Sequence, residues 1–408
     1  KHSISLKISL EEPWPWWKSG NISQLKFTGG SNTNPINSEL SKALLSRKKT
    51  SLPILSELPD SLKRTSYIFE KGNWTAHGKE VIPGIPEIFN QDGKSFENRR
   101  EMGKWLASNK NPLTARVIVN RVWEQLFGAG IVATTSDFGA MGTPPTHPLL
   151  LDWLSVKFMN EWNWSLKKLI REIVLSSTYK QSSVISSEKR EKDPSNKWLS
   201  RGARFRLSAE QTRDQLLAIS GLLSNKMYGP SVMPPQPDNV WSIVYSGADW
   251  TESKGEDRYR RAIYTYWRRT SPYPSMSSFD SPSREYCVSQ RIRTNTPLQA
   301  LVMLNDTVSI EAAQHLASNA IHSTQDNSTR AIINNMYTKA IGISPDSNVL
   351  NTLEKLYEEA LEEFGRSAEQ VNDFVFINTK LNKDLPEFAA LSVTANAILN
   401  LDAFIMKY

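Results

Sequence analysis

The sequence predicts a mainly α-helical chain that contains one extended, β-like insertion and is preceded by the last strands of a β-sandwich. Three observations support this prediction: strand-like alternation near the N-terminus, punctuated helical patterns after about residue 98, and one β-branched and aromatic run at 258–272. An apolar fraction of 39% beside 22% charged residues is typical of globular proteins. We expect three regions: a sandwich tail at 1–30, a linker and lead-in segment at 31–97, and a helical domain at 98–408.

Residues 1–30 alternate apolar and polar side chains. ISLKISL and SQLKFTG have the period of strands, and EEPWPWWKSGN between them places three tryptophans among proline and glycine. Such tryptophans can stack on sugar rings in a carbohydrate-binding-like sandwich. Core rings of a sandwich whose remainder lies upstream give the same pattern. The polar, proline-broken stretch that follows indicates a linker.

Helix starts and ends are clearly marked in the rest of the chain. Pro112 suits a first helical turn, and Gly128 can end the helix that it starts. Short polar residues that can act as N-caps precede the apolar patterns, at Asn111, Thr146, Ser165, Ser208 and Thr296. Further helical patterns cover residues 329–341, 345–364, 367–378 and 386–405.

The segment SREYCVSQRIRTNTPLQ, at 283–299, holds the chain's one cysteine and seven Ser, Thr, Asn or Gln residues. Thr296 with Gln299 predicts a capping box that starts the helix continuing through QALVMLND. The remaining hydrogen-bonding capacity belongs to Arg284, Glu285, Arg291, Arg293 and Asn295. Two interpretations stay open: a buried ion-pair lattice that fixes a loop, or an anion-binding pocket at a helix N-terminus.

The run RYRRAIYTYWRRTSP, at 258–272, predicts a strand or an extended segment lying on the helices. Its five arginines alternate with aromatic residues. This pattern suits single-stranded nucleic acid, or a sulfated or uronic-acid polysaccharide, although strand alternation would place some of the rings in the core. Since no other stretch resembles a nucleic-acid module, we expect no nucleic-acid partner.

Three residues are candidates for chemistry. Asp137 and His147, in DFGAMGTPPTHP, could act as acid and base or join a metal site, but no third ligand can be named, and turn or capping roles are the favoured explanation. Cys287 could be a nucleophile, because nearby arginines would lower its pKa; the alternative is a buried, inert thiol. An enzyme would need these side chains to converge with Arg293 in one open cleft. We expect no metal site.

Composition and charge exclude several classes of protein. A single cysteine excludes an internal disulfide, a C-x-x-C-H haem attachment and a multi-cysteine zinc site. No apolar stretch approaches the length of a membrane span. Residues 343–408 carry five basic and eleven acidic residues, so the +7 of the chain leaves +13 on residues 1–342. The basic part could attract a polyanion or dock on the acidic segment.

Taken in order, the motifs resemble a known family. NPLTARVIVNRVWEQLFG, DFG…PPTHPLLLDWL, WSLKKLIREIVLSSTYKQSS, RFRLSAEQTRDQLLAISG, RRAIYTYWRRTSPYPSMSSFDSPSREYCVSQRIRTNTPLQALVMLND and ALSVTANAILNLDAFI are similar to the domain of unknown function fifteen fifty-three, the planctomycete PSD domain. The resemblance covers roughly residues 65–408.

The resemblance implies the C-terminal part of a multidomain, planctomycete-cytochrome-c-type exported protein in the periplasm or at the cell surface. Such proteins carry a cytochrome-c-like haem domain, a sister domain of unknown function numbered fifteen forty-nine and often a sandwich ahead of this region. The chain starts at KHSISLKISL without an initiator Met or signal peptide, so we expect a piece of a longer protein. The family supplies no established reaction and no established catalytic residues.

Our leading hypothesis is a module that binds an anionic ligand, an acidic or sulfated glycan, in a polysaccharide-handling or electron-transfer setting. The alternatives are a carbohydrate-active or redox enzyme that works with a cytochrome-c domain, and a structural scaffold of a cell-envelope assembly. We expect no cofactor in this chain, so haem c would belong to upstream sequence or to a partner protein. The expected ligand-binding residues are Arg268, Arg269, Arg284, Arg291, Arg293, Asn295, Tyr266 and Trp267.

Overall fold

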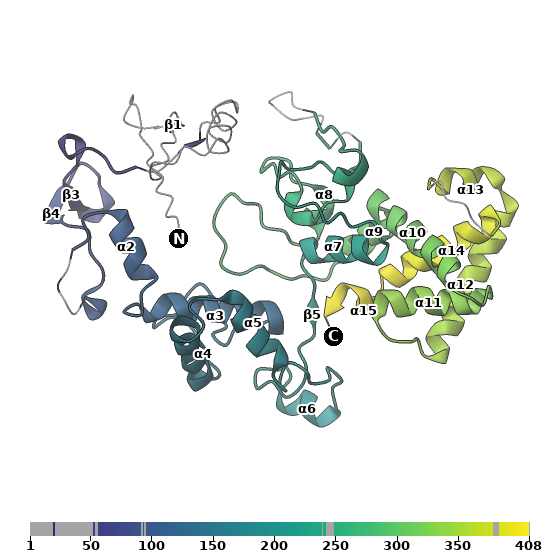
Figure 1. The fold of residues 1–408 in the computed structure, drawn as a ribbon, viewed down its shortest axis with the longest axis horizontal. Helices are drawn as coiled ribbons and strands as arrows, with labels where there is room; N and C mark the ends of the chain where they lie inside the picture. The colour runs from purple at the N-terminus through teal and green to yellow at the C-terminus, as the bar shows by residue number, and fades with distance from the viewer. Residues whose placement is uncertain are drawn as a thin grey trace, which may run out of the picture. The chain divides into compact units, whose positions relative to one another are not determined.

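The computed structural model describes residues 19–20, 52–53, 56–90, 93, 95–238, 240–241, 249–377 and 383–407. The chain divides into two compact units, residues 1–114 and 115–408. The prediction of a mainly α chain is confirmed, since helices make up most of the regular structure and each sheet in the described residues has two strands (Figure 1). The predicted boundaries at 30 and 97 stay predictions.

The first unit consists of short elements. It contains β1 (Ser19–Gly20), β2 (Leu52–Pro53), η1 (Asp60–Leu62), β3 (Ser66–Phe69), η2 (Glu70–Gly72), β4 (His77–Val81), η3 (Glu87–Phe89) and α2 (Arg99–Leu106). Strands β1 and β2 pair antiparallel, as do β3 and β4. The predicted sandwich strands ISLKISL and SQLKFTG lie outside the described residues.

The second unit begins with three helices around their own hydrophobic core. Helices α3 (Pro112–Phe127), α4 (Pro148–Asn160) and α5 (Leu166–Leu175) precede the short α6 (Ser187–Lys192). Each of the first three helices buries an apolar stripe at helical spacing. The stripes meet through Val119, Trp123, Phe127, Leu151, Leu154, Phe158, Leu169 and Ile173.

A second core follows along the chain. Its helices and strands are β5 (Phe205–Arg206), α7 (Ala209–Ile219), η4 (Gly255–Tyr259), η5 (Ala262–Tyr264), α8 (Pro274–Ser278), α9 (Pro297–Asn305), α10 (Thr307–Ser323), α11 (Thr329–Ile341), α12 (Ser347–Arg366), α13 (Ala368–Phe374), α14 (Leu385–Leu399), α15 (Asp402–Ile405) and β6 (Met406–Lys407). The helical patterns predicted after residue 329 are confirmed. Among the helices described here, none is both long and apolar enough to cross a membrane.

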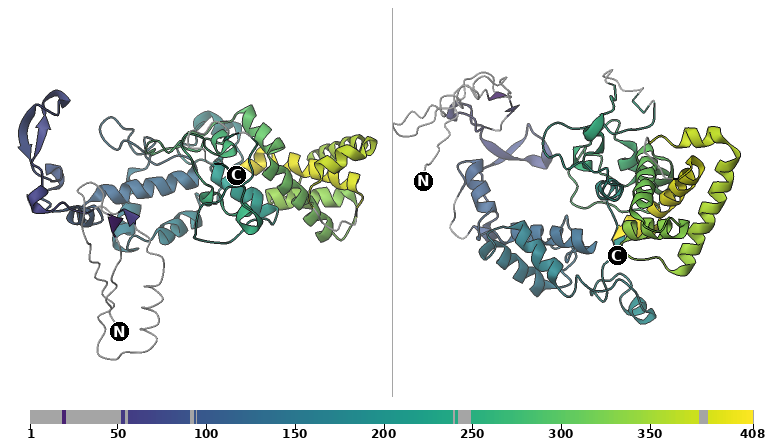
Figure 2. Two further views of the ribbon diagram at one scale, coloured as in Figure 1. Left: turned by 90° about the horizontal axis from the view of Figure 1, so that it is seen from above. Right: turned by 45° about the vertical axis from the view of Figure 1, so that its right-hand side comes forward.

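Helix α14 is the centre of this second core. Helices α10, α11 and α12 pack against it (Figures 1 and 2). Its sequence is apolar on nearly all sides, as expected of a helix surrounded by others. The hydroxyls of Ser392 and Thr394 stay buried by donating to the carbonyls of Phe388 and Ala390, one turn earlier, at 2.8 and 2.9 Å.

The predicted helix caps are confirmed at Asn111, Ser165 and Ser208, and the last forms a full capping box with Gln211. The predictions for Thr146 and Thr296 are wrong, because neither side chain accepts a hydrogen bond from its helix. A proline opens each of these two helices, as Pro112 opens the capped α3, so the proline is not what prevents capping.

The basic and aromatic run at 258–272 is extended, without forming a continuous strand. It contains the one-turn helices η4 and η5, and two isolated parallel bridges join it to the preceding loop, Ser224 to Arg260 and Val232 to Thr265. The second of the two predicted alternatives, an extended segment on the helices, therefore describes it.

The end of the chain closes onto the first core. Strand β6 pairs antiparallel with β5, and the Lys407 ammonium lies 4.0 Å from the Tyr179 ring centroid and 5.7 Å from that of Phe205. Lys407 also donates to the Leu126 carbonyl at 3.0 Å. Gly128 ends α3 in a left-handed conformation, and a Cβ there would lie 2.7 Å from the Phe205 ring.

Asn120 is a buried polar anchor in the first core. Its amide donates to the Val132 carbonyl at 3.0 Å and accepts from the Val132 N–H at 2.8 Å, and its side chain is fully buried. Asn120→Ala would leave both backbone groups unpaired, so we expect a loss of about 2–4 kcal/mol in the free energy of unfolding, measured by urea titration.

Asn305→Ala is the matched control. The exposed Asn305 amide also donates to one backbone carbonyl, that of Leu301, at 2.8 Å. Water can replace that bond, so a change within about 0.5 kcal/mol is expected. Equal losses in the two variants would contradict the assigned role of Asn120.

Candidate functional site

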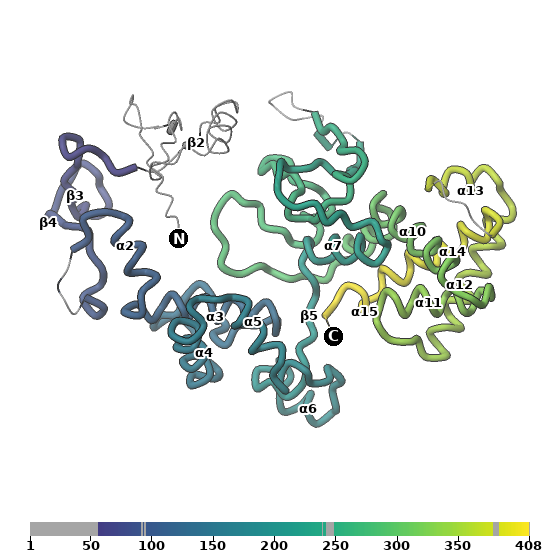
Figure 3. The backbone as a smooth tube through the Cα atoms, viewed as in Figure 1, coloured from purple at the N-terminus to yellow at the C-terminus, as the bar shows by residue number. Residues whose placement is uncertain are grey.

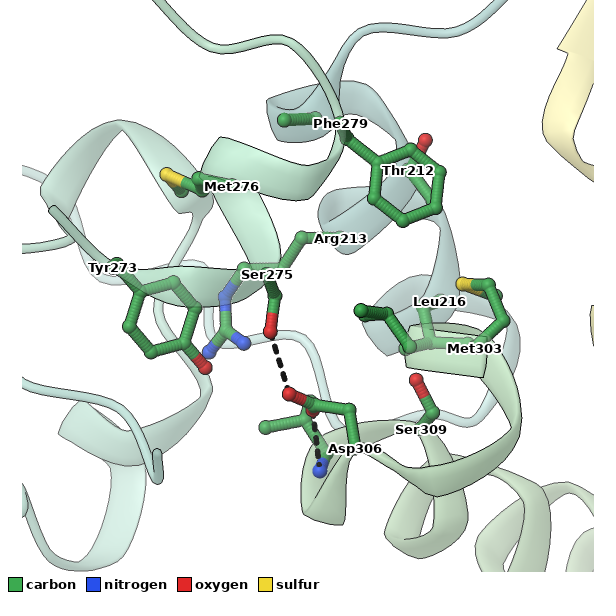
Figure 4. A pocket seen from close by; sticks show the side chains of 13 residues that line it. Thr212, Arg213, Leu216, Tyr273, Ser275, Met276, Phe279, Met303, Asp306 and Ser309 are labelled. Carbon is green, nitrogen blue, oxygen red and sulfur yellow. Dashed lines mark hydrogen bonds between the residues drawn. The ribbon is translucent and has the colours of Figure 1, made fainter. Parts of the chain in front are cut away.

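A small cavity lies inside the second core, between α7, α8, α9 and the start of α10 (Figure 4). Its volume is about 40 Å³, enough for very few water molecules. Most of its lining is apolar, and two of its polar side chains bond within the protein: Ser275 Oγ donates to Asp306 at 2.5 Å, and Arg213 Nη2 donates to the Arg258 carbonyl at 3.1 Å. This space is a packing cavity.

A much larger pocket, of about 840 Å³, lies between the last turn of α3, the first half of α7, η5 and the loop that joins α8 to α9. We call this loop, residues 279–296, the α8–α9 loop. Four guanidinium groups line the pocket, from Arg261, Arg284, Arg291 and Arg293. Four carboxylates line it too, from Glu124, Glu210, Asp214 and Asp280. The pocket is therefore densely charged and balanced in sign.

The α8–α9 loop is closed at its base by Asp280. The Asp280 carboxylate accepts from the Thr294 N–H at 2.7 Å and from the Thr294 hydroxyl at 2.8 Å. The Gln299 amide, on the first turn of α9, donates to the same Thr294 hydroxyl at 3.2 Å. Between these ends the backbone makes a wide excursion beside α7 (Figure 3). Gln299 thus serves the loop and does not form the predicted capping box.

Two arginines attach the far limb of the loop to the helices. Arg291 Nη1 lies 2.6 Å from Glu210 Oε2, in the first turn of α7. Arg293 Nη1 donates to the carbonyl of Gly128 at 2.9 Å, just beyond α3, and its guanidinium lies 4.6 Å from the Phe205 ring centroid. The loop is held over the pocket by contacts with two different helices.

Two glutamates of the pocket have pKa values that are shifted in opposite directions. Glu124 is only 6% exposed, and burial raises the pKa of its carboxyl, although Arg293 and a hydrogen bond from Gln290 oppose the rise. For Glu210, burial also acts to raise the pKa, but the hydrogen bond and charge of Arg291 outweigh it, so the pKa of this carboxyl is lowered.

Arg284 differs from the other pocket arginines. Its guanidinium lies over the Trp267 ring, 5.2 Å from the centroid, and Trp267 is held by a bond from its Nε1 to the Ser283 carbonyl at 3.2 Å. Within the described residues, no carboxylate forms an ion pair with Arg284, whose side chain is exposed. Its donors are available to an external acceptor.

Two arginines of the 258–269 run, Arg258 and Arg260, are used internally. Arg258 pairs with Glu252 and with Glu311, the latter at 3.2 Å. Arg260 is 1% exposed and donates to backbone carbonyls, among them that of Pro230 at 3.0 Å. For the 283–299 segment, where Arg284, Arg291 and Arg293 are exposed, the anion-binding interpretation stays a prediction.

The remaining predicted ligand-binding residues do not line the pocket. Tyr266 packs near Trp241 and Trp250, and the Arg268 guanidinium lies 4.8 Å from the Trp241 ring centroid. Arg269 and Asn295 are exposed. Their role in binding stays a prediction.

The candidate catalytic residues also lie outside the pocket lining. The Asp137 carboxylate accepts from the Gly139 N–H at 2.7 Å, as a turn-forming aspartate does. His147 Nδ1 lies 2.9 Å from the Thr146 hydroxyl. Cys287 is an exposed free thiol on the α8–α9 loop, so the prediction of a buried thiol is wrong.

Sequence reasoning missed four residues that line the pocket: Glu124, Glu210, Asp214 and Arg261. Asp214 accepts from Arg261 Nε at 2.9 Å. The sequence places these groups far from the cysteine segment, and only the fold brings them to it. Among the residues that the structure describes, no cluster of three or more His, Cys, Asp or Glu side chains could hold a metal ion.

Comparison with known families matches residues 98–357 to the model of PSD1, described as a protein of unknown function (DUF1553). The chain belongs to this family. Comparisons with curated proteins and with solved structures gave no match. The matched range of PSD1 contains every residue that lines the charged pocket.

In this PSD1 chain, the opposite pKa shifts of Glu124 and Glu210 can be tested by the pH dependence of stability. Because the pKa of Glu124 is raised above 4.5, the folded chain binds that proton more tightly than the unfolded chain, and wild type loses stability as the pH rises through the raised value. We expect Glu124→Gln to gain stability relative to wild type between about pH 4 and neutral pH, measured by urea unfolding.

Glu210→Gln is the partner variant with the opposite sign. The pKa of Glu210 is lowered, so its contribution is present above 4.5 and is lost as the pH falls through the lowered value. The variant should be less stable than wild type near neutral pH, and this deficit should shrink in acid. Parallel pH profiles for the two variants would contradict the electrostatic assignment.

Proposed function

We propose that this PSD1 chain binds an acidic or sulfated glycan in the pocket beneath the α8–α9 loop. The observation that carries the proposal is the gathering of four arginines in one open pocket of about 840 Å³, of which Arg284 has no carboxylate partner among the described residues. That volume falls within the range of about 300–1,000 Å³ that small-molecule sites occupy.

The lining offers partners for every polar group of such a ligand. A sulfate ester or carboxylate pairs with the fork of donors on Arg284. Sugar hydroxyls both donate and accept, so carboxylates such as Glu124 and amides such as Gln211 and Gln290 can serve them. Exposed Ile263 and Ile292 provide apolar surface for the C–H faces of a sugar ring.

Charge outside the pocket supports an anionic ligand. Residues 1–342 carry +13, which favours the approach of a polyanion even though the pocket lining itself is balanced. Because exposed charges are screened over about 8 Å at physiological ionic strength, binding should weaken as salt is added.

Replacement of the unpaired arginine tests the proposal. We expect Arg284→Gln to weaken binding of a fluorescein-labelled chondroitin sulfate oligosaccharide by about tenfold or more, because charge-assisted hydrogen bonds contribute about 1.5–3 kcal/mol. Fluorescence anisotropy at low salt measures the affinity. Unlabelled polygalacturonate and neutral dextran serve as competitors that separate carboxylate recognition from non-specific polymer binding.

Arg330→Gln is the matched control. Arg330 lies on α11, pairs with Glu354 and does not line the pocket, so the variant has the same change of charge without loss of a pocket group. Its affinity should equal that of wild type. Absence of binding to both acidic polymers at low salt would contradict the proposal and leave the scaffold alternative.

A carbohydrate-active enzyme is the second candidate, and the observation that favours it is the pair Glu124 and Glu210. Two carboxyls of one pocket whose pKa values are shifted apart are suited to act as acid and base. Release of reducing ends from a bound acidic glycan, abolished by Glu124→Gln, would establish this function. Binding without turnover would leave the chain as a binding module.

We also propose the cellular setting on the basis of the family resemblance: an exported protein, in the periplasm or at the cell surface, that works beside a cytochrome-c-like domain or protein. The setting supplies a source of acidic polysaccharide and a haem partner outside this chain. Fractionation of the native cells with an antibody against the chain tests export, and recovery from the cytoplasm would contradict it.

A further inference from the structure

Glu210 occupies an acceptor position that an anionic ligand would take. Its Oε2 lies 2.6 Å from Arg291 Nη1, both side chains line the pocket, and both remain partly exposed, at 23% for Glu210 and 39% for Arg291. A sulfate ester or carboxylate entering the pocket meets a guanidinium whose Nη1 is already bonded to a carboxylate. A ligand that takes the Nη1 donor of Arg291 must compete with Glu210.

The same contact helps to hold the α8–α9 loop in place. The base of the loop is closed by Asp280 and Thr294, while Arg291 ties its far limb to α7. Arg293 provides a second tie through the Gly128 carbonyl. Loss of the Arg291 contact would free the α7 side of the loop without opening its base.

Resting on the proposed glycan binding, we propose that Glu210 is a built-in competitor for the ligand's anionic group at Arg291, and that its displacement releases the α8–α9 loop from α7. The ligand exchanges places with a carboxylate of the protein. Glu210 is then left ionised in the pocket, where it can accept hydrogen bonds from sugar hydroxyls.

The exchange explains why a pocket for an anion contains as many carboxylates as arginines. An unpaired cluster of four guanidinium groups would repel itself, and the resident carboxylates remove that repulsion in the free protein. The net free energy of binding is then the difference between the ligand's ion pair with Arg291 and the Glu210–Arg291 pair that it replaces. Because this difference is small for one group, it favours ligands with more than one anionic group. A polymer with repeated sulfates or carboxylates meets that requirement.

Glu210→Gln tests the proposal by a gain of affinity. Gln keeps the size of the side chain and removes its charge, so the affinity for labelled chondroitin sulfate should rise about fivefold, the factor that corresponds to a partly exposed ion pair of about 1 kcal/mol. Arg291→Gln removes the anchor itself and should weaken binding. An unchanged or lower affinity for Glu210→Gln would overturn the proposal.

Glu354→Gln is the control for the loss of one carboxylate, because Glu354 pairs with Arg330 away from the pocket. It should leave the affinity unchanged, and a similar gain there would mean that net charge alone is responsible. A wild-type chain that binds neither chondroitin sulfate nor polygalacturonate defeats the proposed function. A wild-type chain that binds, with no gain in Glu210→Gln, defeats the exchange alone.

Release of the loop has its own readout. Cys287 is exposed, lies on the α8–α9 loop and is the one thiol of the chain, so a maleimide fluorophore can be placed there without further substitution. Saturating chondroitin sulfate should change its emission in wild type, and labelled Glu210→Gln should show much of that change before ligand is added. Emission that is insensitive to both would overturn release of the loop.

Discussion

A guanidinium group removed from water must find acceptors inside the protein, and this requirement organises the second unit around its arginines. Arg260, almost fully buried, is accommodated by carbonyls of the preceding loop, and Arg258 by two glutamates. Once these groups are paired, the extended run at 258–269 is fixed on the helices. The pocket is then lined by Arg261 of this run and by three arginines of the neighbouring α8–α9 loop. Arginines that reach the interior serve the structure, and those that stay exposed beside the α8–α9 loop line the pocket.

The helical architecture could be predicted from sequence because its signals are local. Proline at first turns, capping side chains and apolar stripes mark α3, α5, α7 and the helices after residue 329, and each matches the structure. Two predicted caps were wrong: in α4 the N-cap position is His147, one residue after Thr146, and in α9 Thr296 is the N-cap but its side chain accepts no bond from the helix. The extended run was ambiguous because its alternation is strand-like, whereas among the described residues it pairs only through two isolated bridges.

The pocket could be predicted only in part because it is assembled from distant segments. Arg284, Arg291 and Arg293 were visible as a dense polar segment, whereas Glu124 and Glu210 lie in ordinary helical patterns more than seventy residues away. The apolar spacing of α3 and α7 indicates their buried faces, but it does not indicate which exposed face a loop will cover. Cys287 shows the converse. Its charged neighbours suggested a nucleophile, and the structure places it as an exposed thiol on the α8–α9 loop. The density of charged and polar residues at 283–299 drew attention to this loop, but it did not indicate which helix residues line the pocket with it.

The aromatic enclosure of Lys407 has a consequence for the integrity of the pocket. Strand β6 holds β5, and β5 leads directly into the first turn of α7, where Glu210 sits. Phe205, in β5, touches both Lys407 and Arg293. Loss of the β5–β6 pairing would therefore loosen the segment that leads into α7, where Glu210 contacts Arg291. Strand β6 thus helps to hold the lining of the pocket in place.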